Sequence, residues 1–246
     1  MLKMLSPALF AALLAALVLS LSQALWVSPL ILQAEVYESD PAQPVEDVAG
    51  HHHDDHAAHE HDESAWAPED GWQRHAATLA SNLVMAVGYG LILCACYAWS
   101  FQTRKKPAGW RAGLAWGGAG YVVFFLAPAL GLPPELPGTL AAELEARQLW
   151  WLLTLLCTAA GLALLVWARP LWLKVVALLP LVLPHVLGAP HPAHAFALAP
   201  ATLTWQFIVA TSLVNALFWL VLGAISAQLF ARARRGDNVA LQGIVL

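Results

Sequence analysis

The chain has 246 residues, of which 59% are hydrophobic and 11% are charged. Soluble globular domains carry roughly 25% charged residues, so this composition excludes an ordinary soluble protein. The formal net charge is -4 at pH 7, and we expect no nucleic acid partner. The composition predicts an all-α integral membrane protein, a single polytopic domain over residues 1–246 with no soluble domain and with membrane lipid around it.

Apolar windows of about 20 residues predict six transmembrane helices, arranged as three outward-facing helical hairpins. The windows are residues 5–32, 76–99, 110–132, 149–168, 171–187 and 203–230. The fifth is the weakest, because it is short and contains Pro180 and Pro184. A re-entrant segment is the alternative for that window.

The first window also resembles a secretory signal peptide. Residues 1–24 begin with Lys3, continue with an apolar run and end in Ser22-Gln23-Ala24, which is an acceptable cleavage site. The apolar stretch nevertheless continues to Leu32, which is long for a signal and suitable for a membrane span. We therefore expect the segment to be retained.

The loop over residues 33–75 contains a tract rich in histidine. Residues 51–61 read HHHDDHAAHEH, and neutral imidazole is the commonest protein ligand for divalent transition metals. The crowded spacing suits a flexible metal collector better than one rigid site. A solvated linker or a cloning tag is the alternative. The candidate metal ligands of the tract are His51, His52, His53, His56, His59 and His61.

Further candidate ligands lie in the other segments predicted to face the same side. Glu135 is framed by prolines, which should hold the carboxylate in a fixed position, although an ordinary surface acid in a tight turn would look the same. His185 could equally be a histidine satisfied at a helix end. The candidates outside the tract are Glu35, Glu38, Glu135, His185, His191 and His194.

Charged residues are absent from the centres of the predicted spans, which argues against a buried carboxylate relay. Asn82 and Asn215 are the candidate polar groups of a translocation path, and hydrogen bonding between helices is the alternative role for both. The glycines at 113, 117, 118 and 120 are suited to close helix approach.

Basic residues fall on one side of the membrane if the six spans alternate in direction. That side receives ten of the twelve Lys and Arg residues. The opposite side receives Arg74 and Arg147, together with fifteen of the sixteen acids and all ten histidines. By the positive-inside rule, we expect both termini in the cytoplasm and the His-rich loop outside.

Six segments together resemble the CbtA family of small bacterial membrane proteins, predicted cobalt transporter subunits. The segments are LWVSPLILQAEVYE at 25–38, AWAPEDGWQR at 65–74, FFLAPALGLPPELPG at 124–138, ARQLWW at 146–151, LPHVLGAPHP at 183–192 and NALFWLVLG at 215–223. The resemblance implies the bacterial inner membrane, cobalt uptake for cobalamin synthesis, and a small single-span partner called CbtB. By position it matches Glu35, Glu38, Glu135, His185 and His191. Gln33 departs from the acidic residue expected there.

These observations favour a membrane permease component for uptake of a divalent transition metal ion. Co²⁺ is favoured, with Ni²⁺ or Zn²⁺ as other possibilities, and the ion is cargo rather than a tightly bound cofactor. The alternative is a membrane-anchored metal-binding or sensing module that does not translocate the ion. An enzyme is not expected, because a haem-bearing subunit would need paired histidines within facing helices and every histidine lies at or beyond the outer edge.

Overall fold

The protein is a bundle of long helices, which confirms the predicted all-α membrane class. The computed structural model describes residues 2–39, 71–104 and 109–242. Within these residues there is no strand, only an isolated bridge between Thr139 and Ala197. In lipid, a helix satisfies the hydrogen-bonding groups of its own backbone. Five helical stretches of the described chain could cross a membrane: Ala8–Glu38, Trp72–Thr103, Trp110–Ala129, Leu144–Trp167 and Ala201–Arg235.

The first stretch is one continuous helix with a widened turn in its middle. α1 (Leu2–Ser22) runs into η1 (Gln23–Val27), a π-helical turn, and then into α2 (Ser28–Ser39). The helix extends beyond the predicted end at residue 32, because the residues that follow include the helix formers Gln, Ala and Glu. The next helix, α3 (Trp72–Arg104), is likewise longer at both ends than the predicted window.

The third stretch repeats the same construction. α4 (Trp110–Tyr121) leads into a second π-helical turn, η2 (Val122–Leu126), and then into the short α5 (Ala127–Ala129). π-helical turns are rare and often lie at functional sites. The first and third stretches are therefore the two that contain a π-helical turn among the described helices.

The second half of the chain contains α6 (Leu144–Trp167), the short helices α7 (Leu171–Val176) and α8 (Leu178–Leu187), and the long α9 (Ala201–Gln242). Pro180 has no N–H to bond the carbonyl of Val176, so α7 ends there. Residues Leu171–Leu187 therefore form a shorter apolar pair of helices beside α6. The count of six spans stays a prediction.

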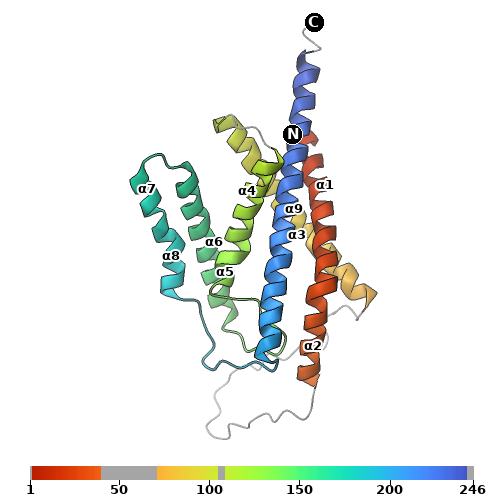
Figure 1. Ribbon diagram of the computed structural model, residues 1–246, viewed down its shortest axis with the longest axis vertical. Coiled ribbons are helices and arrows are strands. Elements are labelled where there is room, and N and C mark those ends of the chain that lie inside the picture. The colour runs from red at the N-terminus through yellow and green to blue at the C-terminus, as the bar shows by residue number, and fades with distance from the viewer. Residues whose placement is uncertain (1, 40–70, 105–108, 243–246) are drawn as a thin grey trace.

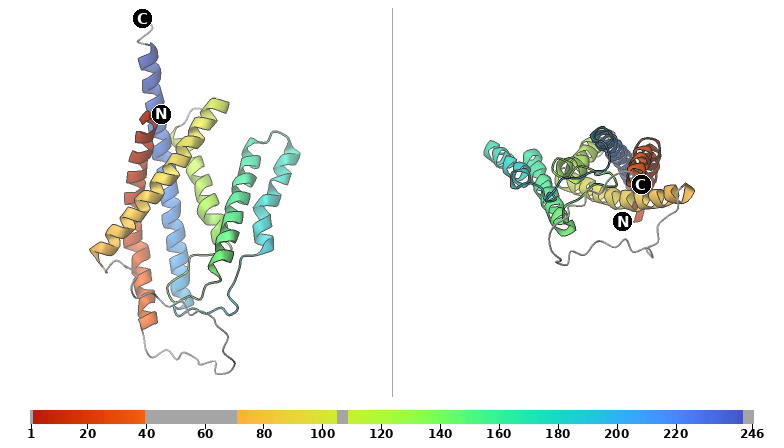
Figure 2. Two further views of the ribbon diagram at one scale, coloured as in Figure 1. Left: turned by 180° about the vertical axis from the view of Figure 1, so that it is seen from behind. Right: turned by 90° about the horizontal axis from the view of Figure 1, so that it is seen from below.

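The densest packing lies among α1, α3, α4 and α9, whereas α6, α7 and α8 form a hairpin at one flank (Figures 1 and 2). A methyl group at Gly117 would lie 2.2 Å from the backbone oxygen of Trp219, and one at Gly113 would lie 2.2 Å from that of Gly223. The expected role of glycine is confirmed at these positions. Gly118, by contrast, faces open space.

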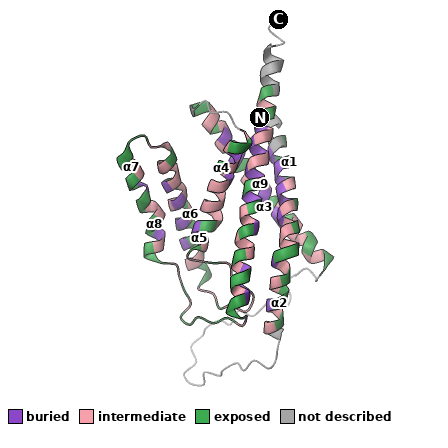
Figure 3. Ribbon diagram, in the orientation of Figure 1, coloured by how far each residue is buried: buried purple, intermediate pink, exposed green. Residues whose placement is uncertain are grey.

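Large apolar side chains cover the outside of the bundle, while the buried residues face inwards (Figure 3). Among the exposed ones are Leu13, Val84 and Leu213. Such a surface would cause aggregation in water, but lipid chains solvate it. The distribution of side chains is therefore that of a multi-pass membrane protein.

The two ends of the bundle differ in what they contain. The end of α2, the connection over residues 130–143 and the connection over residues 188–200 lie at one end (Figure 1). The N-terminal end of α1 and the C-terminal end of α9 lie at the other. We call the first of these the ligand end, because it holds the candidate carboxylates and histidines that the structure describes.

Candidate functional site

Two connections at the ligand end are hydrogen-bonded to each other. The N–H of Leu140 donates to the carbonyl of Phe196 over 2.9 Å, and the N–H of Leu198 donates to the carbonyl of Gly138 over 3.1 Å. Gly138 has a φ of +73°, a conformation that glycine adopts without strain. These bonds fix residues 130–143 against residues 188–200.

Glu38, at the end of α2, lies against this joint. A methyl group at Gly138 would come within 3.2 Å of the Cγ atom of Glu38 and within 2.9 Å of the Leu198 side chain. Leu136, in the same connection, is buried in the main hydrophobic core. Three outer segments that are distant in sequence therefore meet beside one candidate ligand.

Glu135 forms an ion pair with Arg147 of α6. The guanidinium Nη2 atom donates to Oε2 of Glu135 over 3.0 Å, and the two side chains are 32% and 30% exposed. The prolines at 133 and 134 precede the carboxylate, so both backbone and side chain are restrained. Arg147 thus holds Glu135 in place, and the sequence did not identify this partner.

The Glu135–Arg147 pair lines one wall of a cleft of about 470 Å³. The other walls come from η2, α5 and α6, and the cleft opens at the surface. Its lining is mainly apolar, with Phe124, Phe125 and Trp151 among the residues involved. An ion that reached Glu135 through this cleft would meet one carboxylate and one fixed cation.

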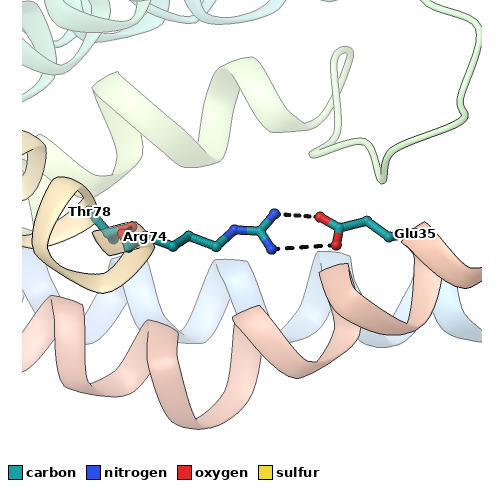
Figure 4. A network of polar contacts seen from close by, with 3 residues as sticks. All are labelled: Glu35, Arg74 and Thr78. Carbon is teal, nitrogen blue, oxygen red and sulfur yellow. Dashed lines mark hydrogen bonds and ion pairs between the residues drawn. The ribbon is translucent and has the colours of Figure 1, made fainter. Parts of the chain in front are cut away.

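Glu35 is held by an arginine in the same manner. The guanidinium of Arg74, in the first turn of α3, donates to both carboxylate oxygens of Glu35 across the gap to α2 (Figure 4). The Thr78 hydroxyl donates to the backbone oxygen of Arg74 over 2.8 Å. Planar guanidinium groups match carboxylates in this two-bond geometry.

The three candidate histidines described by the structure have different surroundings. His185 lies edge-on against Trp150, with 5.9 Å between ring centroids, and the Trp150 indole donates to the carbonyl of Pro184 over 3.2 Å. His191 and His194 are exposed in the connection between α8 and α9. His185 is thus fixed by packing, whereas the other two face solvent.

No group of three or more His, Cys, Asp or Glu side chains converges on a common point in the described part of the chain. The six candidate ligands outside the tract therefore do not form a closed coordination site, and their role in metal binding stays a prediction. His51, His52, His53, His56, His59 and His61 lie outside the described residues.

The two candidate path residues have different partners. The Asn82 side chain is buried and donates to the Ser20 hydroxyl over 2.9 Å and to Oε1 of Gln23 over 2.6 Å. Asn215 donates to the carbonyl of Thr211 within its own helix over 3.0 Å. Asn82 therefore joins two helices by polar contacts, while the hydrogen bond of Asn215 to Thr211 stays within α9.

Comparison with protein families agrees with this architecture. A family model described as "Probable cobalt transporter subunit (CbtA)" matches residues 1–231. The chain belongs to the CbtA family. Neither a curated protein nor a solved structure gives a significant match. As a CbtA member the chain is a multi-pass membrane protein whose family cargo is cobalt, and the word subunit in the family description implies a further component.

Four polar residues of this CbtA chain were missed by sequence reasoning. Arg74 and Arg147 were the two basic residues assigned to the acidic side, and this was a signal that they pair with acids there. Ser20 and Gln23 had no such signal, because both fall in the stretch that resembles a signal peptide, Gln23 within its possible cleavage site. Only the packing of α1 and η1 against α3 gives them a polar partner.

Proposed function

We propose that the chain is the permease component of a system for uptake of a divalent transition metal ion, with cobalt for cobalamin synthesis as its cargo. The observation that carries this proposal is the family match over residues 1–231. The grouping of Glu38, the Glu135 connection and the histidines of residues 188–200 at one end supports it.

In this proposal the ion is collected outside and loses its water stepwise. The His-rich tract raises the local concentration of the ion, and Glu135, His185 and His191 then exchange with its water ligands. Separate weak sites suit this role, because conduction requires an ion to leave each site as readily as it enters. Imidazole and carboxylate ligands bind nickel and copper at least as strongly as cobalt, so geometry or supply must set selectivity.

The proposed arrangement places both termini in the cytoplasm and the ligand end outside, in the bacterial inner membrane. A small single-span subunit of the CbtB kind is the proposed partner, in line with the family's description as a subunit. The cytoplasmic connections predicted from the sequence are too short to form an ATPase, so energy must come from the ion gradient or from another component.

Uptake of radioactive cobalt tests the proposal. Cells without their own cobalt importers would express the chain alone and then with its small partner, with excess nickel or zinc as competitors. We expect uptake above the vector control and a loss of at least tenfold when Glu135, His185 and His191 are replaced by Gln. Glu145→Gln is the matched control, because Glu145 is an exposed acid in the first turn of α6.

The possible results separate the alternatives. Full uptake by the triple variant would overturn the site assignment but leave the permease. If the unmodified chain gave no uptake either alone or with its small partner, and the purified protein still bound metal, the anchored binding module would be favoured instead. Replacing the six histidines of residues 51–61 by Ser should raise the half-saturating cobalt concentration without changing the maximal rate.

A further inference from the structure

Polar side chains lie along one face of α3, and the first and last of them contact the first helical stretch. Arg74, Thr78 and Asn82 are spaced by four residues and therefore share a face. Eight residues of helix cover about 12 Å, so this line reaches from the ligand end well into the bundle.

The first helical stretch supplies a polar partner at both ends of the line. Glu35 of α2 accepts from Arg74 at the outer end, and Gln23 and Ser20 accept from Asn82 at the inner end. Gln23 is the first residue of the π-helical turn η1. We call these six residues the polar seam: Ser20, Gln23, Glu35, Arg74, Thr78 and Asn82.

Small apolar residues close the seam on the side of Asn82 that faces away from the ligand end. α1 presents Ala8, Ala12 and Ala16, each at most 1% exposed. A methyl group at Gly90 of α3 would lie only 3.3 Å from the backbone oxygen of Ala8 and 3.8 Å from the Cβ atom of Ala12. α1 and α3 are thus in close contact here, so the polar seam leads inwards from the ligand end and stops.

We propose that the polar seam is the route by which a partly hydrated divalent metal ion enters the membrane from the ligand end. The structure then represents a state in which the route is closed at the opposite end of the bundle, where the two termini lie. The inference deepens the proposed function and rests on it. Thr78, Asn82, Gln23 and Ser20 supply hydroxyl and amide oxygens, which bind such ions weakly and suit passage rather than retention.

Arg74 has a particular role in this route. Its guanidinium lies at the mouth of the seam and balances the Glu35 charge when no metal is present (Figure 4). An arriving ion takes over the Glu35 carboxylate and displaces the guanidinium. Arg74 is therefore a positioning residue that keeps the empty entrance neutral.

Thiol labelling of intact cells tests the route without any need for transport. In the full chain, with Cys94, Cys96 and Cys157 replaced by Ala, Gln23→Cys would be exposed to a charged, membrane-impermeant reagent added outside. We expect it to react at least tenfold faster than Ser212→Cys, and excess external cobalt to slow that reaction. Ser212 is the control because its hydroxyl bonds to Ile208 within α9.

Uptake by two variants of polar residues within the helices provides the second measurement. We expect Asn82→Leu to lose at least tenfold in cobalt uptake at equal amounts of folded protein in the membrane, and Ser212→Ala, at a residue whose hydroxyl bonds within α9, to stay within twofold of the unmodified chain. Asn82→Asp should retain uptake and change the order in which nickel and zinc compete. A change in that order would not follow if Asn82 only joined two helices.

Failure of this inference differs from failure of the proposed function. Equal labelling at positions 23 and 212, or full uptake by Asn82→Leu, would overturn the seam while the unmodified chain still transports cobalt. Absence of uptake by the unmodified chain would overturn the permease. In that case fast, cobalt-sensitive labelling at position 23 would still establish a metal-accessible seam.

Discussion

Two arginines at the ligand end each hold a glutamate that we predict to bind metal. Arg74 pairs with Glu35 and Arg147 pairs with Glu135. Each guanidinium is a tethered cation that competes with an incoming ion for the same oxygens. Ion pairs that are partly open to solvent contribute only about 0.2–1 kcal/mol, so the competition weakens metal binding without preventing it.

This competition predicts the effect of removing one tethered charge. Arg147→Gln should tighten Co²⁺ binding by the purified protein up to about fivefold, because at most roughly 1 kcal/mol of pairing is lost. A calorimetric titration in detergent would measure the change. Arg147→Lys, which keeps the charge, should show a smaller gain. If Glu135→Gln did not abolish the gain, Glu135 would not be the ligand involved.

At the scale of elements, the contact between α4 and α9 depends on glycine. The backbones of Gly113 and Gly117 approach those of Gly223 and Trp219 so closely that no side chain fits between them. Tyr97 of α3 adds a hydrogen bond to the carbonyl of Gly223 over 3.1 Å. In lipid such packing and polar contacts replace the hydrophobic effect between helices.

Adjacent glycines in α4 provide a matched test of this contact. Gly117→Ala should lower the thermal unfolding midpoint in detergent, because overpacking costs about 1–3 kcal/mol or more where only backbone can move. Gly118→Ala should leave the midpoint unchanged or raise it, since that position is open and alanine favours helix. Equal effects at the two positions would mean that α4 and α9 do not pack as described.

The helices themselves were predictable from the sequence, and the side-chain partners were not. Apolar runs indicate a span because lipid demands satisfied backbones, and this signal located every long helix, although α9 continues twelve residues beyond its predicted window. The helical extension to Ser39 was missed, since polar residues that continue a helix carry no hydropathy signal. Glycine at 113 and 117 did indicate close packing, but not which helix would provide the partner.

The candidate site was less predictable because it depends on contacts between distant segments. Proline on both sides of Glu135 correctly indicated a restrained carboxylate, yet its partner Arg147 follows twelve residues later. The contact of Gly138 with Glu38 joins residues one hundred positions apart, and no local pattern encodes it. Spacing alone also could not separate Asn82, which joins two helices, from Asn215, which bonds within one.

At the scale of the whole molecule, the helices Leu171–Leu187 decide the topology. If they cross the membrane, residues 188–200 face outside, together with residues 130–143. The hydrogen bonds between these two connections require them to share a side. The pair is short, but a 17-residue helix covers about 25 Å, and local thinning of the bilayer can accommodate the difference from roughly 30 Å.

Cysteine labelling checks this topology directly. In a chain without its native cysteines, Ala195→Cys should react with an impermeant reagent in intact cells, whereas Arg169→Cys should react only after lysis. Both positions are exposed, so a difference in reactivity would report the side of the membrane and not burial. The same behaviour at both positions would show that Leu171–Leu187 does not cross, and the span count would then be five.

The alanines of α1 have one more consequence. Ala8, Ala12 and Ala16 recur every four residues, as do Ala11 and Ala15, and all are buried. A slide of α1 by about 6 Å along its axis, with a rotation of about 40°, would place each methyl group where its neighbour had been. Alanine has no rotamers to reorganise, so the two registers would offer nearly the same surface to α3 and α9. The alanine segment of α1 could therefore change its axial position with little repacking, which is the motion that small shear steps between helices require, whereas the hydrogen bonds of Ser20 and Gln23 to Asn82 would have to break.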